Sequence, residues 1–246
     1  IISFNLIGNK ILSFAENDAI ATITKDDESE LCDAIKKLNK NGGTIYINTP
    51  VINISSKCQV QLSGTKAGGL VGMKQPNGQY PSLNFKKVRN EKKKSGGVRI
   101  SGSNQFVKYL IIEFAGNKGI WITGYKNTVD HVISRYNDAS GIQISHGADS
   151  NTINYAYCYR NCDVAGHGGG ADGFSPKLTA KNNVFNFCYA WDNSDDGWDA
   201  FDKEGDVTNS IVINHSACWN NGNVDIFTGK YDYDNGKPLD KNLWTI

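Results

Sequence analysis

Four segments of the chain share an alternation of apolar and polar residues and align without gaps. Each has β-branched or aromatic residues at alternate positions, a polar residue at its fourth position and Asn at its end. The segments are NTVDHVISRYN (127–137), NTINYAYCYRN (151–161), NVFNFCYAWDN (183–193) and IVINHSACWNN (211–221), with a weaker copy, QFVKYLIIEFA, at 105–115. The alternation predicts β-strands, and its recurrence predicts a repeat architecture.

Each copy is followed by a short turn and a second predicted strand. These strands read GIWITG (119–124), GIQISHG (141–147), GFSPKL (173–178), GWDAFD (197–202) and NVDIF (223–227). A unit of about 22 residues built from short strands cannot bury its own apolar face, whereas stacked units can. The period and the Asn-rich turns favour an all-β, right-handed parallel β-helix over a sandwich, whose hairpins would show two-residue Asn-Gly turns.

The spacing of the copies varies. Their offsets are 22, 24, 32 and 28 residues, so we expect the extra residues in loops on one side of the solenoid, where a binding face is usually built. Further strands are expected in TIYI, VINIS, QVQLSG and VRISG. The segment 67–97 has little pattern and is expected to be a long loop or irregular coil.

An amphipathic helix is predicted over about 28–40, ahead of the first coil. Asp27 and Glu30 form a capping box, and the Gly42–Gly43 pair stops the helix. Its apolar residues fall on one stripe: Leu31, Ala34, Ile35 and Leu38. Since a solenoid needs its open end covered, we expect this helix to cap the β-helix.

Composition and charge limit the functions that fit. The chain has 246 residues with a net charge of +1, which favours neither nucleic acid nor a membrane surface as a partner. No stretch approaches the ~20 apolar residues of a membrane helix. We expect a monomer with one domain over 1–246, cut short at its C-terminus. The chain begins with Ile1, which fits a mature, secreted product.

The six cysteines contain no C-x-x-C pair, and the chain has only four His. A zinc site is therefore not expected. Several disulfide pairings are open, of which Cys32–Cys58 is favoured, and buried free thiols are equally consistent with the pattern.

Carboxylates crowd the stretch GGGADGFSPKLTAKNNVFNFCYAWDNSDDGWDAFD, 168–202. When the second strands are aligned on their leading glycines, Gly173 lies over Gly197, one coil of 24 residues further on. Asp172 then stacks on Asp196. Neighbouring parallel strands lie ~4.8 Å apart, and two carboxylates at ~5 Å repel by roughly 3 kcal/mol at an effective dielectric of ~20.

Such a group of like charges predicts a shared cation. Asp195, Asp196 and Asp199 come from one coil and Asp172 from the coil before. An irregular set of carboxylates suits calcium better than magnesium. The alternative is that these Asp residues only terminate turns, which Asp does well.

GADGFSPKLT followed by DNSDDGWDAFD resembles the motifs of polysaccharide lyase family 9, the pectate and rhamnogalacturonan lyases built on a right-handed parallel β-helix. The match is specific over about 166–202, and the coil pattern extends it to about 100–222. In that family the Asp of G-A-D-G-F and the three Asp of D-D-G-W/Y-D bind one calcium. On this chain they are Asp172, Asp195, Asp196 and Asp199.

The resemblance implies calcium-dependent β-elimination on an acidic plant cell-wall polysaccharide, either polygalacturonate or rhamnogalacturonan I. A base would remove the proton at C5 of a uronate, and the oxygen at C4 would leave. Lys177, in GFSPK, matches a family position and is expected to contact a substrate carboxylate.

The chain departs from the family at the base. The family's base is a Lys in an N-G-F-K type motif on the next coil, which this sequence lacks; the residue above Asp199 is Asp225. Lys230 and Lys237 are weaker candidates, and a base in a further coil is the alternative. Two other functions stay open: a non-catalytic carbohydrate-binding β-helix or inactive lyase fragment, and a polygalacturonase-like hydrolase, suggested by His167 in GHGGG.

Aromatic residues recur in one column of the repeats. Tyr159, Trp191 and Trp219 share a position, and we expect them to form a ladder inside the coil stack. Trp198 alternates with Asp199 and is expected to point inward.

Overall fold

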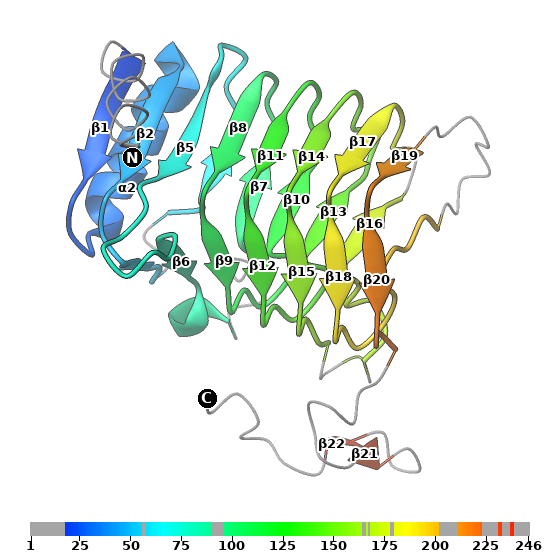
Figure 1. Ribbon diagram of the computed structural model, residues 1–246. Helices are drawn as coiled ribbons and strands as arrows, with labels where there is room; N and C mark the ends of the chain where they lie inside the picture. Colours follow the sequence, from blue (N-terminus) through cyan, green and yellow to red (C-terminus); the bar gives the residue numbers. More distant parts are fainter. Residues whose placement is uncertain are drawn as a thin grey trace, which may run out of the picture.

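The computed structural model describes residues 18–55, 58–89, 96–163, 166, 168–177, 180–201 and 211–222, and the backbone of 231–232 and 237–238. Over these residues the chain winds into a right-handed parallel β-helix (Figure 1). The sequence-based prediction of the fold class is therefore confirmed.

Three parallel sheets run along the solenoid. Sheet A holds β1 (Ala19–Ile23), β2 (Gly43–Ile47), β5 (Gly68–Gly72), β8 (Gln105–Lys108), β11 (Thr128–Asp130), β14 (Thr152–Asn154), β17 (Asn183–Asn186) and β19 (Ile211–Asn214). Sheet B holds β3 (Val51–Asn53), β6 (Ser82–Asn84), β9 (Ile111–Glu113), β12 (Ile133–Arg135), β15 (Tyr157–Tyr159), β18 (Tyr189–Trp191) and β20 (Ala217–Trp219). Sheet C holds β4 (Gln61–Leu62), β7 (Val98–Ile100), β10 (Ile120–Ile122), β13 (Ile142–Ile144) and β16 (Phe174–Pro176). Apart from these, β21 (Tyr231–Asp232) and β22 (Lys237–Pro238) form a small antiparallel pair.

The register of sheet A reproduces the sequence repeats. Val129 pairs with Ile153, which pairs with Phe185, which pairs with Ile213. The first three of these side chains are fully buried in the interior of the solenoid. Their spacing equals the offsets read from the sequence, so the repeat alignment is confirmed residue by residue.

Each aligned segment contains two strands, which makes three strands per coil where the sequence pattern indicated two. The chain bends between the two strands at a residue with positive φ. These bend residues are Tyr109, His131, Tyr155, Phe187 and His215. Left-handed backbone is usually signalled by Gly, Asn or Asp, so the aromatic residues at this bend concealed it.

The N-terminal helix is present as predicted, but only half of the capping box forms, because the amide of Asp27 donates to the carbonyl of Lys25 and not to Glu30. Helix α2 (Glu28–Asn41) begins at Asp27, whose carboxylate accepts hydrogen bonds from the amides of Ser29 and Glu30, and ends at Gly42. The four stripe residues are buried, and the helix contacts β1, β2, β4 and β5 at the end of the solenoid (Figure 1). Strand β1, outside the predicted elements, precedes the helix and extends sheet A.

The expectation of a loop over 67–97 is wrong in part. This segment supplies β5 and β6 to two of the sheets, followed by a short 3-10 helix at Lys86–Val88. Strand β5 reads GGLVG. A Cβ at Gly69 would lie 1.9 Å from the carbonyl oxygen of Phe106, so this position of the strand requires glycine. Because strands are usually indicated by β-branched residues, a glycine-rich strand gives no such signal in the sequence.

The favoured disulfide is present: Cys32 in α2 bonds to Cys58, with Cα atoms 5.9 Å apart. Cys158, Cys162 and Cys188 are buried free thiols, so both interpretations of the cysteines apply to different parts of the chain. Among the described residues, no helix has the length and hydropathy needed to span a membrane.

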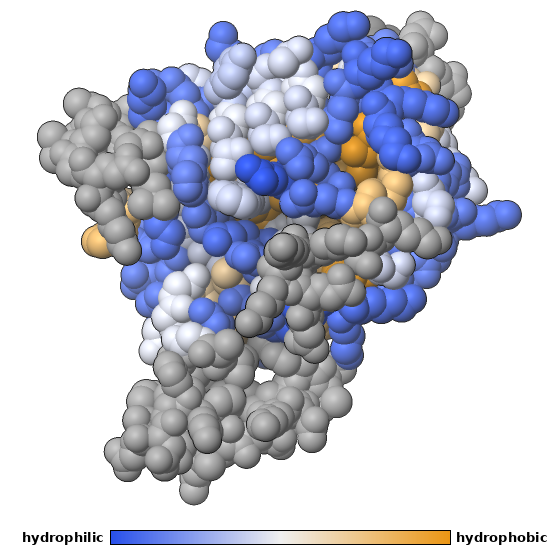
Figure 2. All heavy atoms as spheres, turned by 180° about the vertical axis from the view of Figure 1, so that it is seen from behind, coloured by the Kyte–Doolittle hydropathy of each residue, from blue (hydrophilic) through white to orange (hydrophobic). Residues whose placement is uncertain are grey.

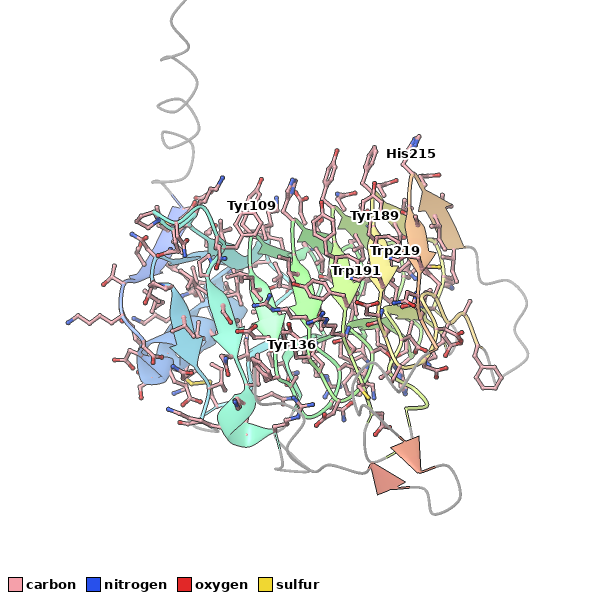
Figure 3. The ribbon with its side chains drawn as sticks, turned by 60° about the horizontal axis from the view of Figure 1, so that its bottom comes forward. Tyr109, Tyr136, Tyr189, Trp191, His215 and Trp219 are labelled. Carbon is pink, nitrogen blue, oxygen red and sulfur yellow. A yellow bond between two sulfur atoms is a disulfide. The ribbon has the colours of Figure 1, made fainter. Side chains whose placement is uncertain are left out.

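The expected ladder of Tyr159, Trp191 and Trp219 exists but lies outside the coils. Rings of Tyr159 and Trp191 stack at 4.4 Å, and those of Trp191 and Trp219 at 5.2 Å. Trp191 and Trp219 stand on the outer face of sheet B (Figure 3). Tyr159 and Trp191 point outward because the residues that precede them, Cys158 and Ala190, are fully buried in the interior. Trp198, by contrast, packs against the core and stacks on Phe174, as predicted.

Candidate active site

The predicted carboxylates gather at the turn that leads into sheet C. The amide of Gly173 donates to the carbonyl of Asp196 at 2.8 Å, and Phe174 pairs with Trp198. Asp172 therefore lies directly over Asp196, as the glycine alignment predicted. A Cβ at Gly173 would lie 2.4 Å from Cβ of Ala190 and 2.8 Å from the carbonyl oxygen of Gly197, so only glycine lets the two turns stack this closely.

Three of the four predicted ligands come together. Carboxylate oxygens of Asp172, Asp195 and Asp196 lie within 4.8 Å of one another, with Asp172 buried, Asp195 half-buried and Asp196 exposed. We call these three residues the acidic cluster. Its burial gradient places one carboxylate in the protein interior and one at the surface, where a ligand from solvent can reach it.

Asp172 is held by a set of hydroxyl and amide donors. It is fully buried, and its Oδ2 accepts from the hydroxyls of Ser140 at 2.9 Å and Ser175 at 2.6 Å. Its Oδ1 faces the amide of Asp196 at 3.4 Å. A buried carboxylate is costly unless it is paired and hydrogen-bonded, so these donors offset the burial of Asp172 and hold its side chain in place.

Lys177 joins the acidic cluster to Asp199. Its Nζ lies 3.3 Å from Oδ2 of Asp172 and also contacts Oδ2 of Asp199. Burial alone would lower the pKa of Lys177, but the hydrogen bond to Asp199 and the charge of Asp172 outweigh it and raise that pKa. Lys177 is therefore a cation, and Asp199 is bound to it and stands outside the group of three.

The remaining carboxylates are held unequally. Oδ2 of Asp195 accepts from the amide of Gly170 at 2.5 Å. Asp196 has a raised pKa because of its partial burial and then the charges of Asp195, Asp172 and Asp199, which Lys177 only partly offsets. The acidic cluster thus carries unbalanced negative charge, and its oxygen-only donor set fits a hard divalent cation.

Several predicted residues fall outside the described part of the chain. Lys230, Asp225 and His167 lie there, and of Lys237 only the backbone, in β22, is described. The predictions that concern the base therefore stay predictions.

The sequence of the chain matches a known family. The family model described as "Pel9A-like, right handed beta helix region" covers residues 13–237. The chain belongs to this Pel9A-like family.

Its relatives carry names of pectic lyases. Pectate lyase L of Dickeya chrysanthemi is 36% identical over 129 residues, which are 52% of this chain and 29% of that protein. Pectate lyase L of Paenibacillus polymyxa (strain SC2) is 31% identical over 193 residues, 74% of this chain and 42% of that protein. The chain thus spans less than half the length of these curated relatives.

Solved structures agree on the fold. The crystal structure of pectate lyase Pel9A superposes with a TM-score of 0.67 at 24% identity, over 82% of this chain and 55% of that one. A rhamnogalacturonan lyase gives 0.63 at 19% identity, over 84% of this chain and 58% of that one. Both similarities concern the β-helix itself.

Two residues of the candidate site were missed at the level of sequence. Ser140 and Ser175 hold Asp172, yet Ser is common in turns and draws no attention. A signal was available, because Ser140 precedes Gly141 as Asp172 precedes Gly173, and the amide of Gly141 donates to the carbonyl of Asp172. Extending the glycine alignment by one coil would have placed Ser140 under the acidic cluster.

Proposed function

We propose that this chain is a calcium-dependent polysaccharide lyase that cleaves pectic polysaccharide by β-elimination. One observation carries the proposal: three carboxylates of the Pel9A-like motif meet within 4.8 Å around the buried Asp172. The names of the curated relatives support the same class of enzyme. Polygalacturonate and rhamnogalacturonan I are the proposed substrates.

Calcium would be held by Asp172, Asp195 and Asp196. Asp199 is separated from the acidic cluster by Lys177, which contacts both Asp172 and Asp199, and it is the proposed fourth ligand. Bound there, calcium would supply positive charge that attracts the substrate carboxylate and stabilises the negative charge that develops beside it. Ser140, Ser175 and Lys177 hold the carboxylate of Asp172 in place by hydrogen bonds within the protein.

The proposed reaction breaks two bonds. A base takes the proton from C5 of a uronate, the electron pair forms a C4–C5 double bond, and the C4–O bond breaks with the oxygen leaving on the neighbouring sugar, where it gains a proton. The two carboxylates raise the pKa of Lys177 and stabilise its protonated form, so Lys177 cannot accept this proton while it remains paired. Its proposed role is to hold Asp172 and Asp199 and to attract the substrate carboxylate.

The base is proposed to be a lysine outside the described residues. Lys230 and Lys237 are the candidates within the chain. A lysine in a further coil, stacked over the column of Asp199, is the alternative. Loss of a base typically costs about 10²–10⁴-fold in rate, so the chain is expected to be slow if neither candidate serves. A secreted protein is proposed as well, since the Cys32–Cys58 disulfide suits an oxidising compartment.

The test is the ultraviolet absorbance of an unsaturated uronide. Polygalacturonate and rhamnogalacturonan I are incubated with the chain in calcium or in chelator, and an Asp196→Ala variant runs alongside. The proposal expects absorbance that grows in calcium and is lost in chelator and in the variant. Reducing ends without absorbance would indicate a hydrolase, and retention on immobilised pectate without either product would indicate a binding protein; both results contradict the lyase.

A further inference from the structure

The outer face of sheet C carries one continuous column of side chains that begins at the acidic cluster. Register through β4, β7, β10, β13 and β16 stacks equivalent positions in successive coils. At one end of the column, Ser175 donates to Asp172. From Ser175 the column runs toward the N-terminal cap, and its members are Ser175, Gln143, Trp121, Arg99 and Gln61.

Two cations meet at Trp121 in this column. Cζ of Arg99 lies 4.6 Å from the ring centroid, and Nζ of Lys118 lies 5.4 Å from it. The ring is fixed by its own hydrogen bond, because Nε1 donates to the hydroxyl of Ser145 at 2.9 Å. Attraction to an aromatic face positions a cation without neutralising its charge, so Trp121 acts as a support for both side chains.

Neither cation has a carboxylate partner within the described residues. The ion pairs found there involve other residues, and Nε of Arg99 is buried without an acceptor. Arg99 and Lys118 are both half-buried. A guanidinium carries five N–H donors, and unmet donors at a half-buried site are costly unless a ligand supplies acceptors.

The surroundings of Lys118 point to the same conclusion. Burial lowers its pKa, the charge of Lys177 lowers it further, and Asp163 only partly opposes them. The influence of Lys177 also means that Lys118 and the acidic cluster share one electrostatic environment. A positive region thus lies beside the negative one on the same face. Sheet C lies behind the other sheets in Figure 1, and the view from behind shows a largely hydrophilic surface (Figure 2).

We propose that Arg99 and Lys118 bind a carboxylate of an acidic oligosaccharide, at a position remote from the bond that is cleaved. This inference rests on the proposed function, in which the substrate is a uronic-acid polymer with a charge on each acidic sugar. Arg99 and Ser175 are three coils apart, roughly 14 Å at ~4.8 Å per coil. A single chain lying along the column would therefore contact the acidic cluster and the two cations at once.

The pair also predicts selectivity. A methyl-esterified or neutral sugar offers no charge to Arg99 and Lys118 and leaves their donors poorly paired. The contribution of the pair therefore depends on free carboxylates. Neither side chain touches the acidic cluster, so their contact with a carboxylate needs no calcium ligand and is expected to form in calcium and in chelator.

The test is titration calorimetry with hexagalacturonate and with its fully methyl-esterified form, each in calcium and in chelator. Arg99→Gln and Lys118→Gln are compared with Lys37→Gln, which removes a lysine of the same charge from the exposed face of α2. We expect each of the first two variants to weaken hexagalacturonate binding about tenfold in both buffers. Binding of the ester, and all binding by Lys37→Gln, should match the wild type. Circular dichroism and thermal unfolding identify a variant that fails to fold, in which case the other variant carries the test.

The outcomes separate the inference from the proposed reaction. An affinity loss without any elimination activity would support the anion site and contradict the lyase. A second outcome would overturn the anion site alone. In it the wild type performs the elimination, and both variants bind hexagalacturonate with an affinity within twofold of the wild type. Equal losses for the acid and the ester, or no binding of hexagalacturonate by the wild type in either buffer, would also overturn it.

Discussion

Two stacks of polar side chains run between the same coils and behave in opposite ways. In one, Asn137, Asn161 and Asn193 lie fully buried one above another; Oδ1 of Asn161 accepts from Nδ2 of Asn137, and Oδ1 of Asn193 accepts from Nδ2 of Asn161. In the other, Asp172 lies over Asp196. An amide is both donor and acceptor and pairs with its own copy, whereas an ionised carboxylate only accepts. A repeat therefore stacks Asn on Asn at a gain and Asp on Asp at a cost.

This difference separates residues that hold the solenoid together from residues that are arranged for a ligand. The Asn stack satisfies its hydrogen-bonding groups within the protein, because its amides also donate to backbone carbonyls such as that of Ser134. The acidic cluster needs Lys177 and two serines to hold one of its members and still leaves the pKa of Asp196 raised. A position where a repeat protein accepts such repulsion is a position to examine for a bound cation.

The largest expected effect comes from converting the first stack into the second. Asn161→Asp keeps the shape of the side chain but replaces the amide group that donates to Oδ1 of Asn193. The new carboxylate has no proton to donate and faces that oxygen. We expect a loss of about 3–5 kcal/mol in unfolding free energy near neutral pH, as for an unpaired buried charge. Urea unfolding measures this loss of unfolding free energy. The control is Asn186→Asp, because Asn186 stacks on Asn154 in a partly exposed position. A loss no larger than that of the control would contradict the comparison.

A smaller effect is expected from removing the cation that supports the acidic stack. Lys177→Gln leaves the buried Asp172 with only neutral donors, the two serine hydroxyls and the amide of Asp196, and should cost about 2 kcal/mol in chelator. Because the folded-state pKa of Lys177 is raised, its contribution is fully present below pH 10.5, the ordinary pKa, and is lost as the pH rises through the folded-state value. Unfolding at pH 7 and pH 11 should therefore show a smaller difference between variant and wild type at the higher pH. An equal difference at both would count against the ion pairs.

The smallest effect is expected from relieving the repulsion. Asp196→Asn replaces a carboxylate by an amide and should stabilise the chain in chelator by less than about 1 kcal/mol, since Asp196 is largely solvated. The folded-state pKa of Asp196 is raised, so the wild type is most stable relative to the variant below pH 3.8, the ordinary pKa, and loses this advantage as the pH rises through the folded-state value. Thermal unfolding in chelator between pH 4 and 7 follows this change. A variant less stable than the wild type at pH 7 in chelator would show that the carboxylate is satisfied without a cation.

The repeats made most of this architecture predictable. Alignment of segments such as 127–137 and 151–161 fixed the register of sheet A, and the leading glycines Gly173 and Gly197 fixed the stacking of Asp172 on Asp196. These features depend only on which residues share a position in successive coils. Such information is present in a single sequence once the period is found.

Features that depend on backbone shape or on side-chain length could not be predicted in this way. The bend at Tyr155 and its equivalents uses left-handed backbone at aromatic residues, and their rings stack along one edge of the solenoid from Tyr109 to His215 (Figure 3). The separation of Asp199 from the other three ligands follows from the reach of Lys177. Alternation alone also placed the Trp191 ladder on the wrong side, since a strand pattern fixes which residues share a face but not which face is inside.

The most direct measurement of the central claim is a calcium titration of the wild type against two variants of the same turn. Asp196→Asn alters the acidic cluster, whereas Asp192→Asn alters a carboxylate that is bound to Asn220 and stands outside the cluster. The account predicts one calcium per chain for the wild type and for Asp192→Asn, an affinity at least about tenfold weaker for Asp196→Asn, and a calcium-dependent rise in melting temperature that follows the same order. Absence of calcium binding by the wild type, or equal loss in both variants, would contradict it.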